Sequence, residues 1–530
     1  MVCKNTTFVH SFGHNIKVML HDLLWAFLCL RQLFRKREES GSFVKFDVDR
    51  TLKKTMTEYS SNFYNESHPR LIEKFEDMLK LRNSYFFDVE EIEVLVDYYI
   101  ERGVHHKARK AVIHGLSLYP NSSALLLKQA QTLLLSKKPV KALEILNYLE
   151  AAEPMNTEML LFKAVVHRNL SDYEGTKSCL IKALNTTSEN KEDIYLDLAF
   201  EQEMVEDYLG AIESLKKSLE INPEHEPSLF ELGYCFDMAE ELEAGIEFFT
   251  NYLDDYPYSF VAWYNLALGY EKLSLFEKAI EAIEYCLVIK DDFVNAHILH
   301  ANMLTSIDQD VAAIEAYTES LKYDPSSAMV YAAIGECFER LEMWELAETN
   351  YLEALSLDTD YVDALMGLGA VKEFEKKYTE SISIYNKALG YDELNMDNWH
   401  IYADLLIKLE RHAEAEVVYQ KMVELFKDDE ESWIGLADIQ SINHGHLKAI
   451  ETLDEAWAEI PDAKDIKWHK IKHLIKAGKL ETAAQQLSDA LVIEPKDSKY
   501  FLNIFPESIL IPNIASLLEI HTQAQSKNEL

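Results

Sequence analysis

The sequence predicts an all-α solenoid, a stack of helical hairpins that repeats along the chain. Three observations support this class. Apolar residues recur with helical spacing, one pattern repeats every 34 residues, and only 16 of the 530 residues are glycine. A solenoid grows by stacking and has no single core to fill, so a chain of this length needs no division into several globular domains.

Residues 260–293 show the repeating unit most clearly. Two amphipathic helices are expected there, joined by a short turn at Ser274 and Leu275. Each helix has one apolar face with i, i+3, i+4 and i+7 spacing, formed by Trp263, Leu266, Ala267 and Tyr270 in the first and by Ala279, Ile283 and Cys286 in the second. A hairpin this small cannot bury both faces alone, so it requires neighbours of the same kind.

Twelve copies of this unit are expected, with one extra residue after the third. They start at residues 89, 123, 157, 192, 226, 260, 294, 328, 362, 396, 430 and 464. The eighth position is alanine or glycine in ten copies, and the twentieth is alanine in nine. Seven of the twelve prolines fall at the thirty-second position, where each second helix should end. Small residues in phase indicate a close approach of helices.

The pattern repeated at this period resembles the tetratricopeptide repeat (TPR). It consists of an aromatic residue, Leu-Gly/Ala, Tyr, Ala, an apolar residue and Pro. The resemblance covers residues 89–497. It implies a right-handed superhelix whose first helices line the concave inner face. Copies three and seven to ten vary at several positions, and the twelfth has Lys467 and Lys470 where apolar residues are usual. The family is a binding scaffold, so the resemblance indicates architecture better than it indicates a partner.

The two ends are expected to differ from the repeats. Residues 1–50 are predicted to be an extension, poorly ordered or peripheral, residues 51–88 an N-terminal capping region, and residues 498–530 a C-terminal capping segment and tail. Pro69 should begin a helix over residues 68–82. Residues 18–37 join an apolar run, too short to span a bilayer, to four basic residues. They are either an extension without its own fold or the one segment that could contact a membrane.

Composition narrows the class of partner. The formal net charge of −39 argues against nucleic acid and against anionic membrane surfaces. It suits a cationic partner, or it serves only to keep a long array soluble. The six cysteines are scattered, with no CxxC pair, and four of them fall inside repeat helices. Buried thiols of this kind fit a reducing compartment, so a cytoplasmic location is expected.

No sequence pattern indicates catalysis. Walker-type and dinucleotide-binding glycine loops, HExxH and GxSxG are all absent from the sequence. His297 and His300 lie one helical turn apart, a spacing that can serve a metal, but they occupy packing positions and are interpreted as core or boundary histidines. We therefore expect no enzymatic activity, no cofactor and no metal.

The resemblance implies that the second, fifth, ninth, twelfth and thirteenth positions point into the groove. Phe200, Phe230, Tyr234 and Tyr264 would then form an aromatic patch across repeats four to six. Beyond it the groove positions turn acidic, at Glu336, Glu339, Asp363, Glu373, Asp397, Asp404, Glu431 and Asp438. The Lys-Asn arrangement that grips a peptide carboxylate in some family members is absent from these positions. A protein or peptide with apolar and basic residues should suit this surface.

Two functions remain open. One is a scaffold or adaptor that binds a protein segment in the concave groove. The other is a regulatory or assembly subunit of an enzyme or membrane complex, recruited through residues 18–37. The alternative that the aromatic side chains only pack against the adjacent repeat stays open as well.

Overall fold

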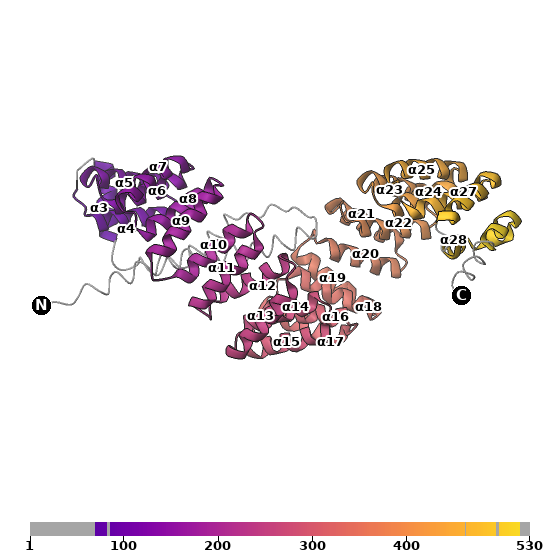
Figure 1. The fold of residues 1–530 in the computed structure, drawn as a ribbon, viewed down its shortest axis with the longest axis horizontal. Coiled ribbons are helices and arrows are strands. Elements are labelled where there is room, and N and C mark those ends of the chain that lie inside the picture. Colours follow the sequence, from indigo (N-terminus) through magenta and orange to yellow (C-terminus); the bar gives the residue numbers. More distant parts are fainter. Residues whose placement is uncertain (1–68, 82–84, 462, 494–497, 520–530) are drawn as a thin grey trace. The chain divides into compact units, whose positions relative to one another are not determined.

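The computed structural model describes residues 69–81, 85–461, 463–493 and 498–519. Within these ranges the regular structure is helical and contains no strand, which confirms the all-α class (Figure 1). The basic and apolar segment at residues 18–37, the rest of the predicted extension and residues 520–530 lie outside the described residues. The division into extension, capping regions and repeats stays a prediction.

The described chain forms tandem helical hairpins. The first helices are α4 (Val89–Glu101), α6 (Ser123–Leu135), α8 (Thr157–Asn169), α10 (Lys191–Glu203), α12 (Glu226–Met238), α14 (Phe260–Lys272), α16 (Val294–Ser306), α18 (Ala328–Arg340), α20 (Val362–Phe374), α22 (Met396–Lys408), α24 (Glu430–Asn443) and α26 (Lys464–Lys476). The second helices are α5 (His105–Leu118), α7 (Pro139–Ala152), α9 (Tyr173–Thr186), α11 (Tyr208–Ile221), α13 (Leu242–Asp255), α15 (Phe276–Ile289), α17 (Asp310–Tyr323), α19 (Trp344–Leu357), α21 (Tyr378–Tyr391), α23 (His412–Leu425), α25 (His446–Glu459) and α27 (Leu480–Ile493).

The starts of the first helices follow from local chemistry. Many are preceded by a polar residue whose side chain accepts a hydrogen bond from a backbone N–H of the first turn: Ser122, Asn156, Ser259, Ser327, Asn395 and Asp429. Eleven of the twelve first helices begin at the residue that the repeat phase predicts. The exception is α10, which begins at Lys191, one residue before the predicted start, beside the extra residue of the third repeat.

The turn inside each hairpin holds one residue in the left-handed region. These residues recur at the repeat spacing, at Gly103, Lys137, Ser171, Glu206, Glu240, Ser274, Asp308, Glu342, Lys376, Glu410, Gly445 and Gly478. Nine of the twelve are not glycine, although this conformation favours glycine. The turn at Gly445 is one residue late because α24 has 14 residues where the other first helices have 13.

The small residues at the eighth and twentieth positions lie between packed helices. All sixteen alanines at these two positions, Ala267 and Ala279 among them, are at most 1 % exposed. At Gly369 an added Cβ would lie 2.3 Å from the ring of Tyr385. There is no room there for a side chain, so the small residues set how closely helices approach.

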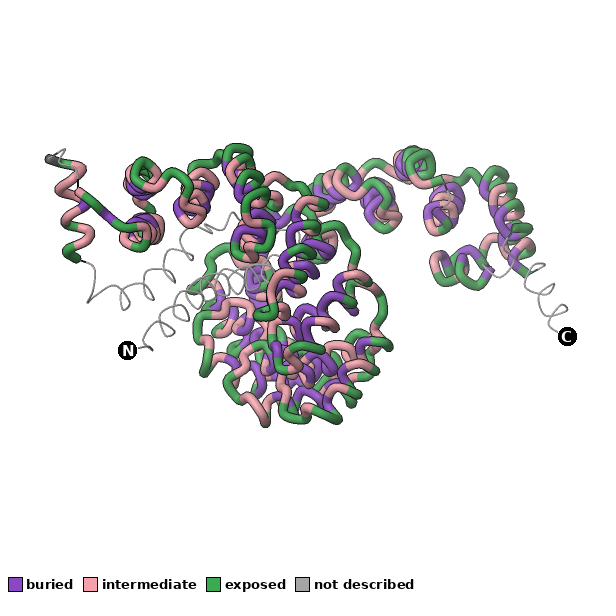
Figure 2. Tube along the Cα trace, turned by 60° about the vertical axis from the view of Figure 1, so that its left-hand side comes forward, coloured by how far each residue is buried: buried purple, intermediate pink, exposed green. Residues whose placement is uncertain are grey.

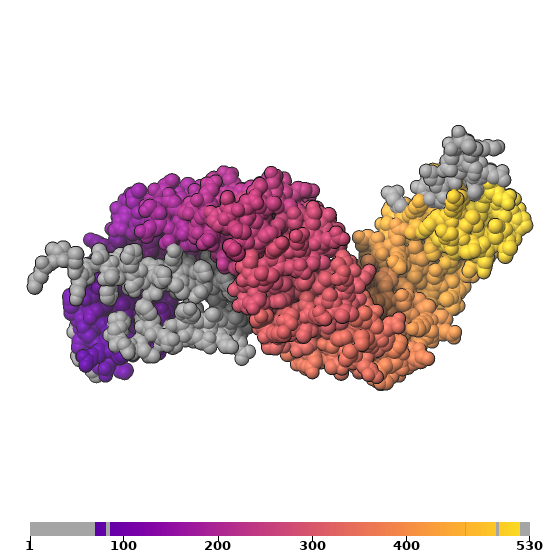
Figure 3. Space-filling view, turned by 90° about the horizontal axis from the view of Figure 1, so that it is seen from below, coloured from indigo at the N-terminus to yellow at the C-terminus, as the bar shows by residue number. Residues whose placement is uncertain are grey.

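The described chain divides into two compact units, which meet in sequence at Pro325 and Ser326. Inside each unit, helices contact their neighbours in sequence, and several first helices also contact the first helix of the next hairpin, as in the pairs α4 with α6, α12 with α14 and α18 with α20. Buried and exposed positions alternate along the hairpins (Figure 2), and consecutive hairpins are neighbours on the surface of each unit (Figure 3). Each unit is therefore a solenoid with separate first-helix and second-helix faces.

Additional helices cover apolar surface at both ends. The helix α3 (Pro69–Leu81) buries Phe75 against Phe87 and Tyr99, with each pair of ring centroids 5.9 Å apart. After the last hairpin come α28 (Ser498–Ile504), the short 3₁₀ helix η2 (Pro506–Leu510) and a helical segment over residues 512–519. Phe501 and Ile514 from this region are buried in the same cluster as Trp468.

The four described cysteines, Cys179, Cys235, Cys286 and Cys337, are buried. Burial raises the pKa of Cys286 to about 12, so this thiol behaves as a small apolar side chain. No helix in the described ranges is long and apolar enough to cross a membrane.

Candidate functional site

The predicted aromatic residues lie on the first helices of the N-terminal unit. Phe200, Phe230, Tyr234 and Tyr264 are all half-buried at the edge of one hydrophobic core. That all four residues form one aromatic patch stays a prediction. Phe230 and Tyr264 are 6.2 Å apart between centroids, whereas the neighbour of Tyr234 is Tyr208 at 6.1 Å.

Two phenylalanines that the repeat positions did not indicate complete the contact between Phe230 and Tyr264. Phe293 lies 5.0 Å from Tyr264, 6.1 Å from Phe230 and 5.4 Å from Phe260, which is in turn 6.3 Å from Phe230. We call these four rings the aromatic cluster. Phe260 and Phe293 are the first and last residues of one repeat. The stacking of consecutive hairpins brings them next to Phe230 and Tyr264, which occupy the fifth positions of their repeats. Because Phe260 and Phe293 are not themselves at predicted groove positions, the sequence did not indicate them.

The acidic residues of the C-terminal unit differ in their partners. Lys472 donates a hydrogen bond of 2.7 Å to Asp438, and the ring of His473 lies 2.8 Å from the same carboxylate. Burial acts to raise the pKa of Asp438, but the hydrogen bond from His473 and the charge of Lys472 outweigh it and hold this pKa well below its usual range. The negative charge of Asp438 is thus largely satisfied within the chain.

Glu336 and Asp404 remain exposed. Glu336 has a distant partner in Arg340, with 3.7 Å between nitrogen and oxygen. Asp404 takes part in no ion pair within the part of the chain that the structure describes. Burial raises the pKa of the nearby Tyr419 to about 12, and the charges of Asp404, Glu431 and Asp438 add to this rise. Three carboxylates thus act together on one tyrosine side chain.

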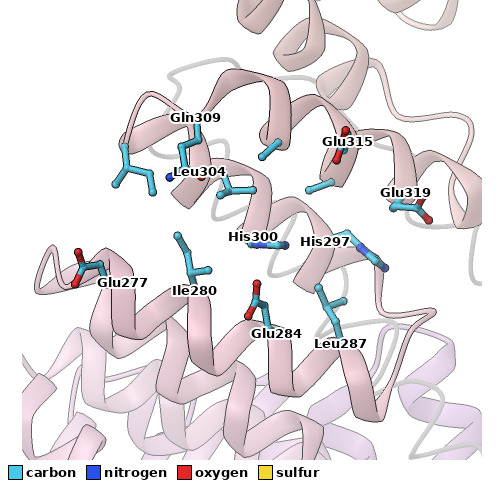
Figure 4. Close-up of a pocket in the computed structure, with 13 residues that line it drawn as sticks. Glu277, Ile280, Glu284, Leu287, His297, His300, Leu304, Gln309, Glu315 and Glu319 are labelled. Carbon is cyan, nitrogen blue, oxygen red and sulfur yellow. The ribbon is translucent and has the colours of Figure 1, made fainter.

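A separate cleft of about 640 Å³ lies on the second-helix face of the N-terminal unit, between α15 and α17, with α16 as its floor (Figure 4). Both histidines noted in the sequence line it. The ring of His297 lies 2.8 Å from the carbonyl oxygen of Asp291 and stacks on Tyr323 at 6.0 Å. Burial lowers the pKa of His300, which favours the neutral form of its ring. The described residues contain no group of three or more His, Cys, Asp or Glu that could hold a metal ion.

Comparison with known proteins places the chain among repeat proteins. A family model described as tetratricopeptide repeat matches residues 396–439. The TPR repeat-containing protein YpiA of Bacillus subtilis is 22% identical over 64% of this chain and 80% of its own length. Superkiller protein 3 of Schizosaccharomyces pombe is 21% identical over 55% of this chain. The chain spans only 20% of that relative's length.

Among solved structures, the APC/C hetero-tetramer Cut9-Hcn1 contains a chain that is 17% identical, with a TM-score of 0.36, over 76% of this chain and 92% of its own. Together, the matching family model, the TPR-named relative and the tandem hairpins at the 34-residue spacing identify the class. The described residues form a tandem array of tetratricopeptide-type hairpins.

Proposed function

We propose that this protein is a non-enzymatic scaffold that binds segments of partner proteins on its first-helix face. The observation that carries this proposal is the aromatic cluster, in which four rings in mutual contact stay partly open to solvent. Aromatic side chains dominate the energetics of protein interfaces because each buries a large apolar area at a small cost in conformational entropy. An apolar side chain of a partner would pack against this cluster.

The acidic surface of the C-terminal unit supports a partner that also carries basic residues. Asp404 and Glu431 are exposed and near Tyr419, and they carry charge that the described residues do not pair. Lysine or arginine side chains of a partner would therefore be attracted to these two residues. Asp438 contributes less to this attraction, since its carboxylate already contacts Lys472 and His473.

Affinity purification of the full chain followed by mass spectrometry tests this function. Replacing both Phe230 and Tyr264 with alanine should remove partners held by apolar contact, and Asp404→Lys should remove partners held by charge. Phe248→Ala is a matched control, because Phe248 is a half-buried aromatic residue on the second helix α13 and contacts Phe236 and Phe249 instead. If both groove variants retain the same partners as the control, this function is wrong.

A further inference from the structure

The cleft between α15 and α17 exists because two side chains of α17 are small. Ala312 and Ala316 of α17 line the cleft. Ile280 and Leu287 line it from α15 (Figure 4). The corresponding positions of the next repeat hold Leu346 and Asn350, which are larger. The local sequence of α17 therefore leaves apolar surface open between two second helices, where a longer side chain would have closed it.

The cleft combines an apolar floor with an acidic rim. Leu304 and Ile307 extend the floor formed by the side chains of α15 and α17. Glu277 and Glu284 line one edge, and Glu315 and Glu319 line the other. Glu319 pairs with Lys322 at 2.6 Å, while the other three carboxylates have no ion-pair partner among the described residues. No lysine or arginine lines the cleft.

His300 adds a polar group to the floor. Its ring lies between Leu304 and Glu284 in Figure 4, and no hydrogen bond to it is found within the described ranges. By contrast, His297 is held by its contacts with Asp291 and Tyr323. A neutral imidazole without an internal partner can accept a hydrogen bond from an incoming donor, such as an ammonium or guanidinium group.

We propose that this cleft binds a short amphipathic segment of another protein, with apolar side chains inserted between α15 and α17 and with lysine or arginine side chains at the glutamate rim. Charge complementarity selects this occupant. Three unpaired carboxylates and the formal net charge of −39 repel acidic proteins and nucleic acids, whereas a cationic segment gains attraction at both edges. None of the four rings of the aromatic cluster lines this cleft, so the site goes beyond the proposed function.

The test measures binding of a synthetic amphipathic helical peptide of leucine and lysine to the full chain by fluorescence anisotropy. Replacing Glu284 and Glu315 together with lysine should weaken binding by at least roughly tenfold, because attraction at both edges becomes repulsion. Glu247→Lys together with Glu281→Lys is the charge-matched control, since both residues are exposed on second helices and neither lines the cleft. Equal affinity of the double variant and this control would overturn the proposal.

A second variant tests the apolar floor. Ala312→Trp should fill the cleft and weaken binding of the peptide by roughly tenfold as well. Val288→Trp, at a position that is 84% exposed on α15, adds the same side chain outside the cleft and should leave affinity unchanged. Because the charge-reversed positions are exposed, the first test stays decisive even if Ala312→Trp fails to fold.

Photo-cross-linking distinguishes the possible occupants. A photoreactive residue at Gln309, which lines the cleft, should cross-link to the peptide in the full chain. Cross-links to residues 18–37 of the same chain instead would show that the cleft holds the chain's own segment, and cross-links between two copies would show self-association. Either result overturns the proposal of a separate partner. The Phe230 and Tyr264 variants should leave peptide binding here unchanged, which separates this site from the proposed function.

Discussion

Asp404 and Asp438 occupy the ninth position of consecutive repeats, yet their surroundings differ. The ninth position of the repeat after Asp438 is Lys472, which donates a hydrogen bond to it, whereas the ninth position after Asp404 is Asp438 itself. The sequence analysis assigned both residues to one acidic groove because it considered each position alone. The pairing depends on which residues adjacent first helices bring together, and α24 and α26 are in contact.

Replacing Asp438 with asparagine should lower the free energy of unfolding by about 1–2 kcal/mol. The substitution removes the charge that Lys472 and His473 contact, and the partial exposure of Asp438 limits the loss. Denaturant titration measures the change. Asp404→Asn should stay within about 0.5 kcal/mol of the wild type, because Asp404 is exposed. A loss of equal size in both variants would show that the pairing of Asp438 contributes nothing.

The contribution of Asp438 should depend on pH. Its pKa is lower in the folded chain than in the unfolded chain, where aspartate titrates near about 3.9. The stabilisation is therefore fully present above the unfolded pKa and is lost as pH falls towards the folded pKa. The difference in melting temperature between the wild type and Asp438→Asn should be constant from about pH 7 to pH 5 and should narrow below about pH 4. A difference that widens on acidification would contradict this assignment.

Within each hairpin, the turn shows what helical periodicity can and cannot predict. The pattern of apolar residues placed the turn near Ser274, and the structure puts this residue in the left-handed region with φ 57°. The pattern did not indicate that the same conformation recurs at Lys137, Glu240, Glu342 and Lys376, since none of these residue types favours it. The stacking of the two helices imposes the turn on whatever residue occupies that position.

Glycine at one of these turns should therefore stabilise the chain. Glu342→Gly removes the steric cost of φ 57° and should raise the free energy of unfolding by roughly 0.5–1 kcal/mol after the greater flexibility of glycine in the unfolded chain is subtracted. The reverse change, Gly478→Ala at φ 76°, should lower it by a similar amount. Thermal unfolding of the two variants would contradict this prediction if both melting temperatures moved in the same direction.

The close approach of paired helices depends on small residues. Ala279 is fully buried, and leucine in its place should overpack the contact between α14 and α15 at a cost of roughly 1–3 kcal/mol. Leucine at Glu281, two residues along the same helix and exposed, should change stability by less than about 0.5 kcal/mol. Denaturant titration checks the pair, and equal tolerance at both sites would contradict the repeat phase.

Across the whole molecule, the sequence predicted the features that repeat and missed those that occur once. Apolar periodicity, small residues in phase and proline at helix ends were sufficient for the fold class and for nearly all helix starts. The cleft beside His300 arises from two alanines in one helix, and the aromatic cluster uses Phe260 and Phe293 from repeat boundaries. Such features depend on contacts between different repeats, which a pattern averaged over repeats cannot show.

Destabilisation should remain local in a chain of this kind. Because helices contact mainly their neighbours in sequence, Ala279→Leu should increase amide hydrogen exchange in α13 to α16 and leave α4 to α6 unchanged. Hydrogen exchange followed by mass spectrometry resolves these segments. A uniform increase along the N-terminal unit would indicate that the unit unfolds as a single cooperative body.

The dependence of each hairpin on its neighbours alone has a consequence for how the chain can change length. Excising one 34-residue hairpin from the interior of a unit brings together two surfaces of the same design, since small residues occupy the same positions on both. The chain can thus gain or lose whole interior hairpins. After such a change, each remaining hairpin still packs against a similar hairpin on either side.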